Sequence, residues 1–479
     1  MNNKLDILIT GGIVITMTGS GVGIIENGAV GIRGNIIAVV GAADEVRRTY
    51  SADRIIDAAG KAVMPGLIDS HIHTGDGLLR GVSQDLSNWM QQGLWPFEEV
   101  LRQDVDAVKK GSMMNILEAL KAGTTTFCDF DTPMETILQN HIKLGTRARV
   151  AELVSELPKE VKTPVGELYE FDPAEGNRKF ENNIKLIEKW NGRENGRITC
   201  MMGPQGADML SRELLDEVHR AAERYDTKIH MHVSQGVREI DQMCRRYGKR
   251  TIPFLDEIGY LDNRLLAVHL TVATPDETRY LAKKGAAMVL CSGSIGIIDG
   301  IVPPAAEFLE VSNRLALGSD QAPGNNCNNM FNEMKFTAIL NKCKAKDPTV
   351  FPAWKVLRMA TIEAARAIGL GDQIGSLEVG KKADVLIIDL TQPALSPLIL
   401  RPIRNVVPNL IYSAKGSEVQ TVIVDGNVLI DDFKVLPVDE KEVVRQAQDA
   451  VRRICSQTVS GFERIADTPL RDMMLQGKL

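Results

Sequence analysis

Eight short apolar runs, separated by helical stretches, constrain the fold of this 479-residue chain more than any other feature. Two of the separating stretches, 211–225 and 274–285, carry the apolar spacing of amphipathic helices. Alternating strands and helices are typical of βαβ units with a parallel sheet. Eight such units favour an α/β fold of the (β/α)8 TIM-barrel type, with a doubly wound open sheet as the alternative. The runs are 62–73, 123–131, 147–155, 197–206, 227–235, 265–273, 286–294 and 314–323.

The two ends of the chain differ from the middle, because they consist of short strand-like segments separated by glycine turns. Near the C-terminus, 382–390 and 419–430 read as strands, and Asp425-Gly426 is a hairpin turn signal. These features predict a small β-sandwich domain built from both chain ends. We therefore expect four parts: 1–61 and 371–435 in the β-sandwich, 62–370 in the barrel, and a C-terminal helical extension at 436–479.

Composition excludes several classes of function. A net charge of −6 and a pI of about 5.8 argue against nucleic acid and against anionic membrane surfaces as partners. No run of apolar residues is long enough to span a membrane, and the N-terminus lacks a signal-peptide layout. The seven cysteines form no CxxC pair, which fits a reducing compartment. We expect a cytoplasmic protein with a small-molecule partner, assembled as a homodimer or higher homo-oligomer.

Histidines gather at the ends of the predicted strands. His71 and His73 end the first run, and residues two apart in a strand point to the same face. The fifth run ends with His230 and His232, and the sixth carries His269. Neutral imidazole is a common metal ligand, so the pattern indicates a metal site at the barrel mouth. His232 is nearer the strand end and is the expected third ligand, whereas His230 is expected to pack one layer deeper.

Asp320, at the end of the eighth run, is the expected fourth protein ligand. A metal lowers the pKa of bound water towards neutrality, and Asp320 could take the proton that this water loses. His269 would then face the electrophilic centre of the substrate and polarise it or donate a proton. Asp320 and His269 are therefore the predicted catalytic residues.

This order of motifs resembles the amidohydrolase superfamily over nearly the whole chain. The resemblance is carried by PGLIDSHIH (65–73), HMHVSQ (230–235), LGSD (317–320) and the tail 361–390. The loop 77–99 resembles the branch that holds S-adenosylhomocysteine, methylthioadenosine and guanine deaminases and the triazine hydrolases such as atrazine chlorohydrolase.

The resemblance implies a metal ligand set and a metal count. It makes His71, His73, His232 and Asp320 the metal ligands and His269 the catalytic histidine. The fourth run, 197–206, lacks the lysine that bridges two metals in binuclear relatives. One divalent metal is therefore expected, zinc first and iron as the alternative.

The chain departs from this family at a residue that carries protons. Deaminases of the branch resemble HxxE after strand five, but here the glutamate is replaced by Gln235. An amide cannot carry a proton between groups. Asp76, Asp129 and Asp131 are candidate replacement acids. A second departure follows strand seven, where this chain has Ser292-Gly293-Ser294.

Four residues are predicted to contact substrate: Trp89, Arg80, Gln235 and Ser292. Trp89 would offer an aromatic wall for a flat substrate, and Arg80 could pair with an anion. Gln235 and Ser292 follow strands whose ends face the metal.

The predicted function is hydrolysis of a carbon–nitrogen bond by a metal-activated hydroxide. The bond would belong to a heterocyclic amine or to an amide, urea or carbamate. One alternative is removal of chloride or thiolate from a heterocycle, which needs no protonation of the leaving group. The other is a non-catalytic barrel scaffold, which would be expected to have lost its metal ligands.

Overall fold

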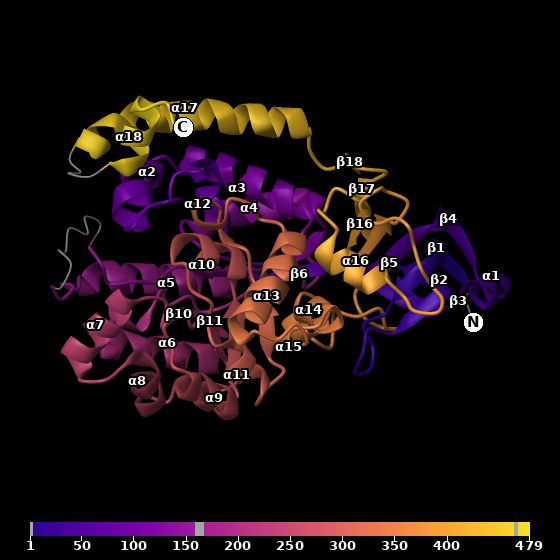
Figure 1. Ribbon diagram of the computed structural model, residues 1–479, viewed down its shortest axis with the longest axis horizontal. Helices are drawn as coiled ribbons and strands as arrows, with labels where there is room; N and C mark the ends of the chain where they lie inside the picture. Colours follow the sequence, from indigo (N-terminus) through magenta and orange to yellow (C-terminus); the bar gives the residue numbers. More distant parts are fainter. Residues whose placement is uncertain (1–2, 159–166, 464–467) are drawn as a thin grey trace.

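The computed structural model describes residues 3–158, 167–463 and 468–479. A nine-stranded sheet lies at one end of the molecule, and parallel strands surrounded by helices form the rest (Figure 1).

Strands from both ends of the chain form the nine-stranded sheet. Its order is β18-β17-β16-β15-β5-β1-β2-β3, and β4 pairs with β1. β5 joins the two halves, because it pairs antiparallel with β15 and parallel with β1. The strands are β1 (Lys4–Ile15), β2 (Ile24–Arg33), β3 (Ile36–Ala42), β4 (Ser51–Asp57), β5 (Lys61–Pro65), β15 (Val385–Asp389), β16 (Val419–Val424), β17 (Asn427–Asp431) and β18 (Lys434–Val435).

The remaining strands are parallel and lie in the middle of the chain. One sheet has the order β14-β6-β7-β8-β9, and the other has the order β10-β11-β12-β13. Isolated parallel bridges, Met202 to Ile229 and Gly206 to His232, link the residues after β9 to β10. The strands are β6 (Leu67–His73), β7 (Thr124–Asp131), β8 (Arg147–Glu152), β9 (Ile198–Cys200), β10 (Ile229–Val233), β11 (Leu265–His269), β12 (Ala287–Leu290), β13 (Leu315–Leu317) and β14 (Asp320–Gln321).

Each of the eight predicted apolar runs contains a strand, so the mixed α/β prediction with parallel strands is confirmed. The first run is divided, however, because β5 belongs to the nine-stranded sheet and β6 to the parallel strands. Gly66 separates them, and a Cβ there would lie 1.9 Å from the Thr125 Oγ1 atom. Hydrophobicity alone cannot show this division, because the apolar residues continue from β5 across Gly66 into β6.

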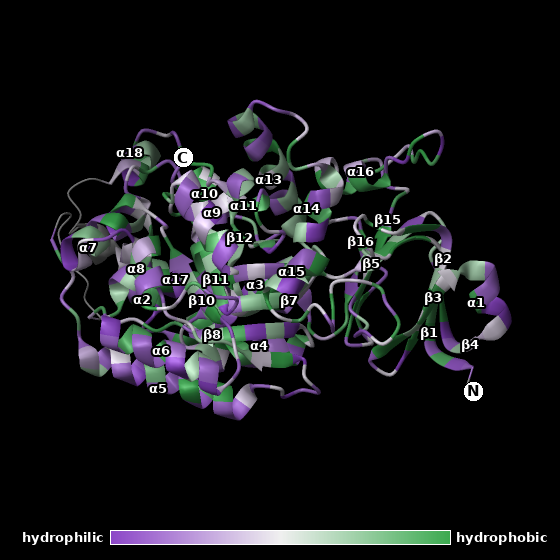
Figure 2. Ribbon diagram, turned by 90° about the horizontal axis from the view of Figure 1, so that it is seen from below, coloured by the Kyte–Doolittle hydropathy of each residue, from purple (hydrophilic) through white to green (hydrophobic). Residues whose placement is uncertain are grey.

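Helices cover the parallel strands and turn polar faces outwards. In Figure 2 the helices α5 and α6 show hydrophilic residues on the outside. Among the strands that they and the other helices surround, β11 (LLAVH) and β12 (AMVL) are almost entirely hydrophobic. The helices are α1 (Ala43–Thr49), α2 (Trp95–Leu101), α3 (Val105–Lys121), α4 (Met134–Leu144), α5 (Pro173–Trp190), α6 (Arg212–Arg224), α7 (Val237–Tyr247), α8 (Thr251–Glu257), α9 (Pro275–Lys284), α10 (Ser292–Ile298), α11 (Ala305–Leu309), α12 (Ala322–Asn325), α13 (Met330–Ala345), α14 (Ala353–Met359), α15 (Ile362–Ala367), α16 (Val406–Tyr412), α17 (Glu440–Glu463) and α18 (Pro469–Leu475), with short turns η1 (Thr74–Leu79), η2 (Met90–Leu94) and η3 (Ala207–Met209).

Local sequence signals explain where α9 begins and ends. The Thr274 hydroxyl accepts a hydrogen bond from the Glu277 amide, and the Glu277 carboxylate accepts one from the Thr274 amide, which forms a capping box. Gly285 ends the helix in the left-handed conformation with φ of 97°. These residues confirm the helix predicted for 274–285.

The long helix α17 packs on α3 and α2 and crosses one side of the molecule (Figure 1). Within the described ranges, no helix is both long enough and apolar enough to cross a bilayer.

Candidate metal centre

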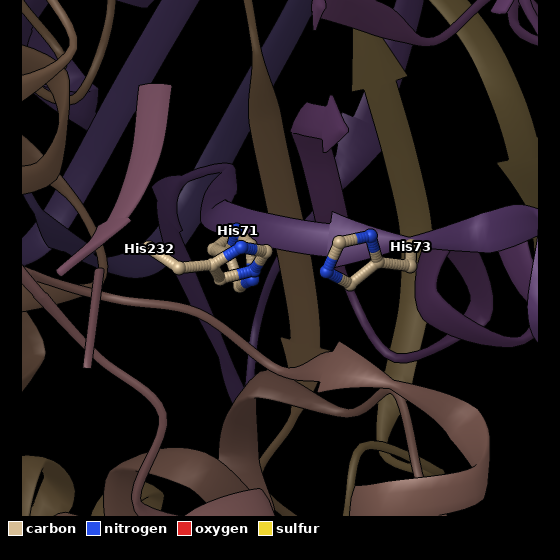
Figure 3. A group of neighbouring side chains, drawn as sticks. All are labelled: His71, His73 and His232. Carbon is tan, nitrogen blue, oxygen red and sulfur yellow. The ribbon is translucent and has the colours of Figure 1, made fainter. Parts of the chain in front are cut away.

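Three histidines from two strands converge on one space. His71 and His73 come from β6 and His232 from β10, and their imidazoles face one another (Figure 3). One ring nitrogen of each lies within 4.8 Å of the other two. All three side chains are buried. The period of two along β6 brings His71 and His73 to the same face, as predicted.

His269 and Asp320 meet the same cluster from β11 and β14. Ligand atoms of His71, His269 and Asp320 also lie within 4.8 Å of one another. The Asp320 Oδ1 atom is 3.4 Å from His71 Nε2 and 3.5 Å from His73 Nε2. His269 and Asp320 have φ of 77° and 63°, a left-handed region that non-glycine residues seldom occupy. Strained backbone of this kind is common at functional sites.

Burial sets the protonation of the cluster. It lowers the pKa of His71 and His232 well below the usual value and lowers the pKa of His269 to about 4. Burial alone would raise the pKa of Asp320, but its contact with His71 and the nearby His269 hold that pKa well below the usual value. The cluster therefore presents neutral imidazoles beside an ionised carboxylate.

Surrounding side chains fix the position of Asp320. The Ser294 hydroxyl donates to Asp320 Oδ2 at 2.6 Å, and Asn328 Nδ2 donates to the Asp320 carbonyl at 2.8 Å. The Asp69 carboxylate accepts hydrogen bonds from the Ser319 amide and hydroxyl, which ties β6 to the residues before β14. A Cβ at Gly318 would lie 2.8 Å from the His71 Cβ atom, so glycine permits this close approach.

Two of the histidines, His71 and His232, are held in orientation by a contact at the Nδ1 atom. The Nδ1 atom of His232 lies 2.7 Å from the Gln205 carbonyl oxygen, so it carries the proton and leaves Nε2 as a lone-pair donor. The Nδ1 atom of His71 lies 2.9 Å from His230 Nε2. The His230 ring stacks on Phe130, with ring centroids 4.9 Å apart. Metal-binding histidines are commonly held in this way.

The residues present fit a divalent metal. His71 Nε2 and both ring nitrogens of His269 are buried without a hydrogen-bond partner among the residues described. Unpaired buried nitrogens are costly unless a ligand satisfies them. Three imidazoles and one carboxylate are a donor set that zinc accepts.

A pocket of about 560 Å³ opens beside His232. Trp89, Trp95 and Tyr169 line it with aromatic surface, and Gln235 lies on its wall. The Gln235 side chain makes no hydrogen bond with another described residue, so its amide is available to a ligand.

Other predicted residues have partners within the protein. Arg80 forms an ion pair with Glu118, and the Ser292 hydroxyl lies 2.8 Å from Thr337 Oγ1. Neither lines the described pocket, so their contact with substrate stays a prediction.

The three candidate replacement acids are also bonded within the protein. Asp76 and Asp131 both accept hydrogen bonds from Arg102. Asp129 accepts one from Thr74 and lies 3.0 Å from His141 Nε2. None of the three lines the described pocket.

Several pocket residues could not be predicted from the sequence. Asp208, Arg238 and Glu239 line the pocket beside His232. They lie in η3 and α7, just beyond the apolar runs. A search of the sequence for polar residues one turn past each strand end would have included them.

Comparison with known proteins agrees with this geometry. Residues 62–429 match the model of the Amidohydrolase family. The 5'-deoxyadenosine deaminase of Methanosarcina acetivorans is 34% identical over 462 residues, covering 94% of this chain and 99% of its own length. The 5-methylthioadenosine/S-adenosylhomocysteine deaminase of Desulforudis audaxviator is also 34% identical, covering 94% and 99%.

Solved structures show the same fold. A zinc-bound adenosine deaminase from Xanthomonas campestris superposes with a TM-score of 0.87 at 29% identity, covering 95% of this chain and all of its own. The atrazine chlorohydrolase TrzN of Arthrobacter aurescens TC1, complexed with zinc, has a TM-score of 0.81 at 23% identity, covering 93% and 100%.

The fold and the histidine cluster define a metal-dependent hydrolase built on parallel βα units. The chain belongs to the amidohydrolase family, as its resemblance predicted. It is a hydrolase that acts on carbon–nitrogen bonds other than peptide bonds.

Proposed function

We propose that this protein deaminates a heterocyclic amine of the adenosine type at a site holding one zinc ion. The convergence of His71, His73, His232 and Asp320 carries the proposal, because these groups offer three neutral nitrogens and one carboxylate to one space. The names of the relatives, which are 5'-deoxyadenosine, methylthioadenosine and adenosine deaminases, support the substrate class.

A zinc ion bound there would lower the pKa of a water molecule towards neutrality. The ionised Asp320 would accept the proton that this water loses as its oxygen attacks the ring carbon. His269, held neutral by burial, would hydrogen-bond to the reacting centre and steady the charge that develops there. Trp89 and Trp95 would stack against a flat ring.

The architecture supports a closed barrel as part of this proposal. β14 pairs with β6, β13 pairs with β12, and the bridge from Met202 to Ile229 spans the gap between β9 and β10. We propose that these contacts close eight parallel strands into a (β/α)8 barrel over 62–370.

Both ends of the chain would form the second domain of this architecture. We propose that the nine-stranded sheet folds over its own apolar core as a β-sandwich from 1–61 and 371–435, with 436–479 as a helical extension. The core that supports it draws buried residues from β1, β2, β15 and β16. The homodimer or higher homo-oligomer and the cytoplasmic location stay predictions.

A second candidate is removal of chloride from a chlorinated ring, and Gln235 favours it. A chloride leaves without a proton, so an amide in place of the glutamate costs this reaction less. The scaffold alternative finds no support in the site, since the expected donor groups of the histidine cluster are all present.

The proposal can be tested by measuring the ammonia and chloride that the protein releases from a mixed panel of amino- and chloro-substituted heterocycles. Purified protein loaded with zinc should release ammonia from at least one adenosine-type nucleoside in step with loss of the amine. His71→Ala and Asp320→Ala should lower kcat/KM by at least about 10³-fold, because each removes a group of the proposed metal site. Release of chloride alone would favour the second candidate, and unchanged turnover in His71→Ala would contradict the site.

A further inference from the structure

The pocket beside the metal cluster contains five carboxylates. They are Glu167, Asp208, Glu239, Asp241 and Asp299. A group that protonates a departing nitrogen must hold a proton near neutral pH and must have an oxygen free to reach the substrate. These two conditions separate the five residues.

Three of the carboxylates fail one of the conditions, and a fourth, Asp299, lies at the exposed rim of the pocket. Glu239 accepts hydrogen bonds from the amides of Ser234 and Gln235 and from the Thr251 hydroxyl, so its oxygens are committed. Asp241 forms an ion pair with Arg245. Glu167 is exposed to solvent and lacks the burial that favours the protonated form of a carboxyl group. Asp299 lies at the exposed rim, but burial of its carboxyl group and the nearby Asp320 raise its pKa to about 6, so Asp299 is the rival acid of this pocket.

Asp208 is buried in the pocket wall and has an unpaired oxygen. It is 2% exposed, and its Oδ2 atom has no hydrogen-bond partner among the residues that the structure describes. Burial raises the pKa of its carboxyl group. The charged and titratable groups that face it are Arg238, Arg246, Glu239 and Tyr169.

The two arginines leave this carboxyl group without a direct counter-ion. In the described part of the chain no ion pair joins Asp208 to Arg238 or Arg246. Arg238 lies over the Tyr169 ring and donates to the Met90 sulfur at 3.5 Å. Arg246 donates to the Tyr169 carbonyl. Asp208 is thus a buried acid on the pocket wall without a direct counter-ion.

The backbone places Asp208, in η3 after β9, beside the end of the strand that carries His232. Gly206 forms a parallel bridge with His232, and Asp208 follows two residues later. Its carboxyl group folds back over Gly206, because a Cβ at Gly206 would lie 2.9 Å from Asp208 Oδ1 and 3.8 Å from the His232 carbonyl. Asp208 and Gln235 therefore extend from neighbouring strand ends and line one pocket.

We propose that Asp208 is the acid that protonates the departing nitrogen, the task that the Gln235 amide cannot perform. This inference rests on the proposed deamination. The water oxygen bonds to the ring carbon, and the carbon–nitrogen bond breaks with its electron pair on nitrogen. That nitrogen takes the proton of Asp208 and leaves as ammonia. Asp320 passes the proton of the attacking water to solvent, and Asp208 regains one, so amine and water give hydroxylated ring and ammonia.

The leaving group tests this role. In Asp208→Asn, kcat/KM for a 6-aminopurine nucleoside should fall by about 10²–10⁴-fold, the usual contribution of a general acid. For the 6-chloro analogue it should fall by less than about tenfold, because chloride needs no proton. Equal losses on both substrates, or a loss below tenfold on the amine, would overturn the proposal.

A second variant tests whether a carboxyl group elsewhere can take over. Gln235→Glu in the Asp208→Asn background should raise turnover of the amine at least about tenfold, since it returns an acid to the same pocket. No gain would overturn the proposal independently of the chloro analogue. Asp241→Asn is the matched control, a rim carboxylate of the same pocket, and should keep the amine-to-chloride ratio of the wild type.

Folding and metal content separate the remaining outcomes. Asp208→Asn should bind as much zinc as the wild type. If it does not fold, Asp208→Glu replaces it, and this displaced acid should lower amine turnover more than chloride turnover; equal effects would overturn the proposal. A wild type that releases no ammonia from any nucleoside would refute the proposed function, whereas normal wild-type turnover that survives in Asp208→Asn would refute only the role of Asp208.

Discussion

His230 shows how a residue outside the proposed ligand set can control the metal. It is buried between Phe130 and His71, and its Nε2 atom lies 2.9 Å from His71 Nδ1. For His71 to offer its Nε2 lone pair, Nδ1 must carry the proton and donate to His230. His230→Phe keeps the ring and removes that acceptor.

We expect His230→Phe to lower zinc affinity by about 10–100-fold, the usual effect of losing such a partner. Competition with a zinc-binding dye measures this. His219→Phe, on α6 and outside the cluster, is the control and should bind zinc like the wild type. Equal affinity in all three proteins would show that His230 does not orient His71.

At the level of single residues, the sequence indicated most of the histidine cluster but not the pocket residues around it. The spacing of His71 and His73 and the strand-end positions of His232, His269 and Asp320 are visible in the chain, because a strand alternates its faces. Asp208 could not be predicted in the same way. Its meaning depends on burial and on an unpaired oxygen, which are properties of the fold.

At the level of helices and strands, a buried carboxylic acid, Glu333, lies where α10 and α13 meet. Glu333 on α13 accepts hydrogen bonds from the Gly293 amide and from Asn325 Nδ2. Burial raises the pKa of Glu333 to about 8, from an ordinary 4.5. The folded state therefore binds this proton more tightly than the unfolded state does.

Stability should consequently depend on pH through Glu333. Its contribution is fully present below about pH 4.5 and is lost as pH rises through about 8, with a slope of at most about 1.4 kcal/mol per pH unit. Glu333→Gln keeps an acceptor and removes the titration. The free energy of unfolding, measured by denaturant titration between pH 5 and 8, should fall less steeply in the variant; parallel curves would be the contrary result.

The positions of the strands could be predicted from the sequence, whereas the pairing between strands could not. All eight apolar runs contain strands because apolar runs bounded by turns favour them. The division of the first run at Gly66 depends on contacts with β1 and β15, which are distant in sequence. Pattern reasoning has no access to such contacts.

In the whole molecule, one buried arginine joins the parallel strands to the nine-stranded sheet. Arg147, at the start of β8, donates Nε and Nη2 to the two carboxylate oxygens of Asp384 at 2.7 and 2.9 Å. It also donates to Asp425 at 3.1 Å. The Arg147 side chain is 2% exposed, so the carboxylates depend on it for their charge balance.

Arg147→Met should lower the free energy of unfolding by about 3–5 kcal/mol, because it leaves the buried Asp384 carboxylate without its counter-ion and leaves Asp425 with only the more distant Lys382. Arg54→Met is the matched control. It removes the pair with Asp431, whose side chains are about 40% exposed, and should cost about 0–1 kcal/mol. Equal losses in chemical denaturation would mean that the buried junction contributes no more than a surface pair.

Metal content tests the central claim most directly. The wild type, purified without chelator and measured by mass spectrometry of its metals, should hold close to one divalent ion per chain, with zinc the most abundant. His73→Ala, which removes one proposed ligand and leaves the pocket walls in place, should hold roughly a tenth of that or less. Wild-type protein that folds but binds no metal when supplied with zinc, or a variant that binds as much as the wild type, would contradict the account.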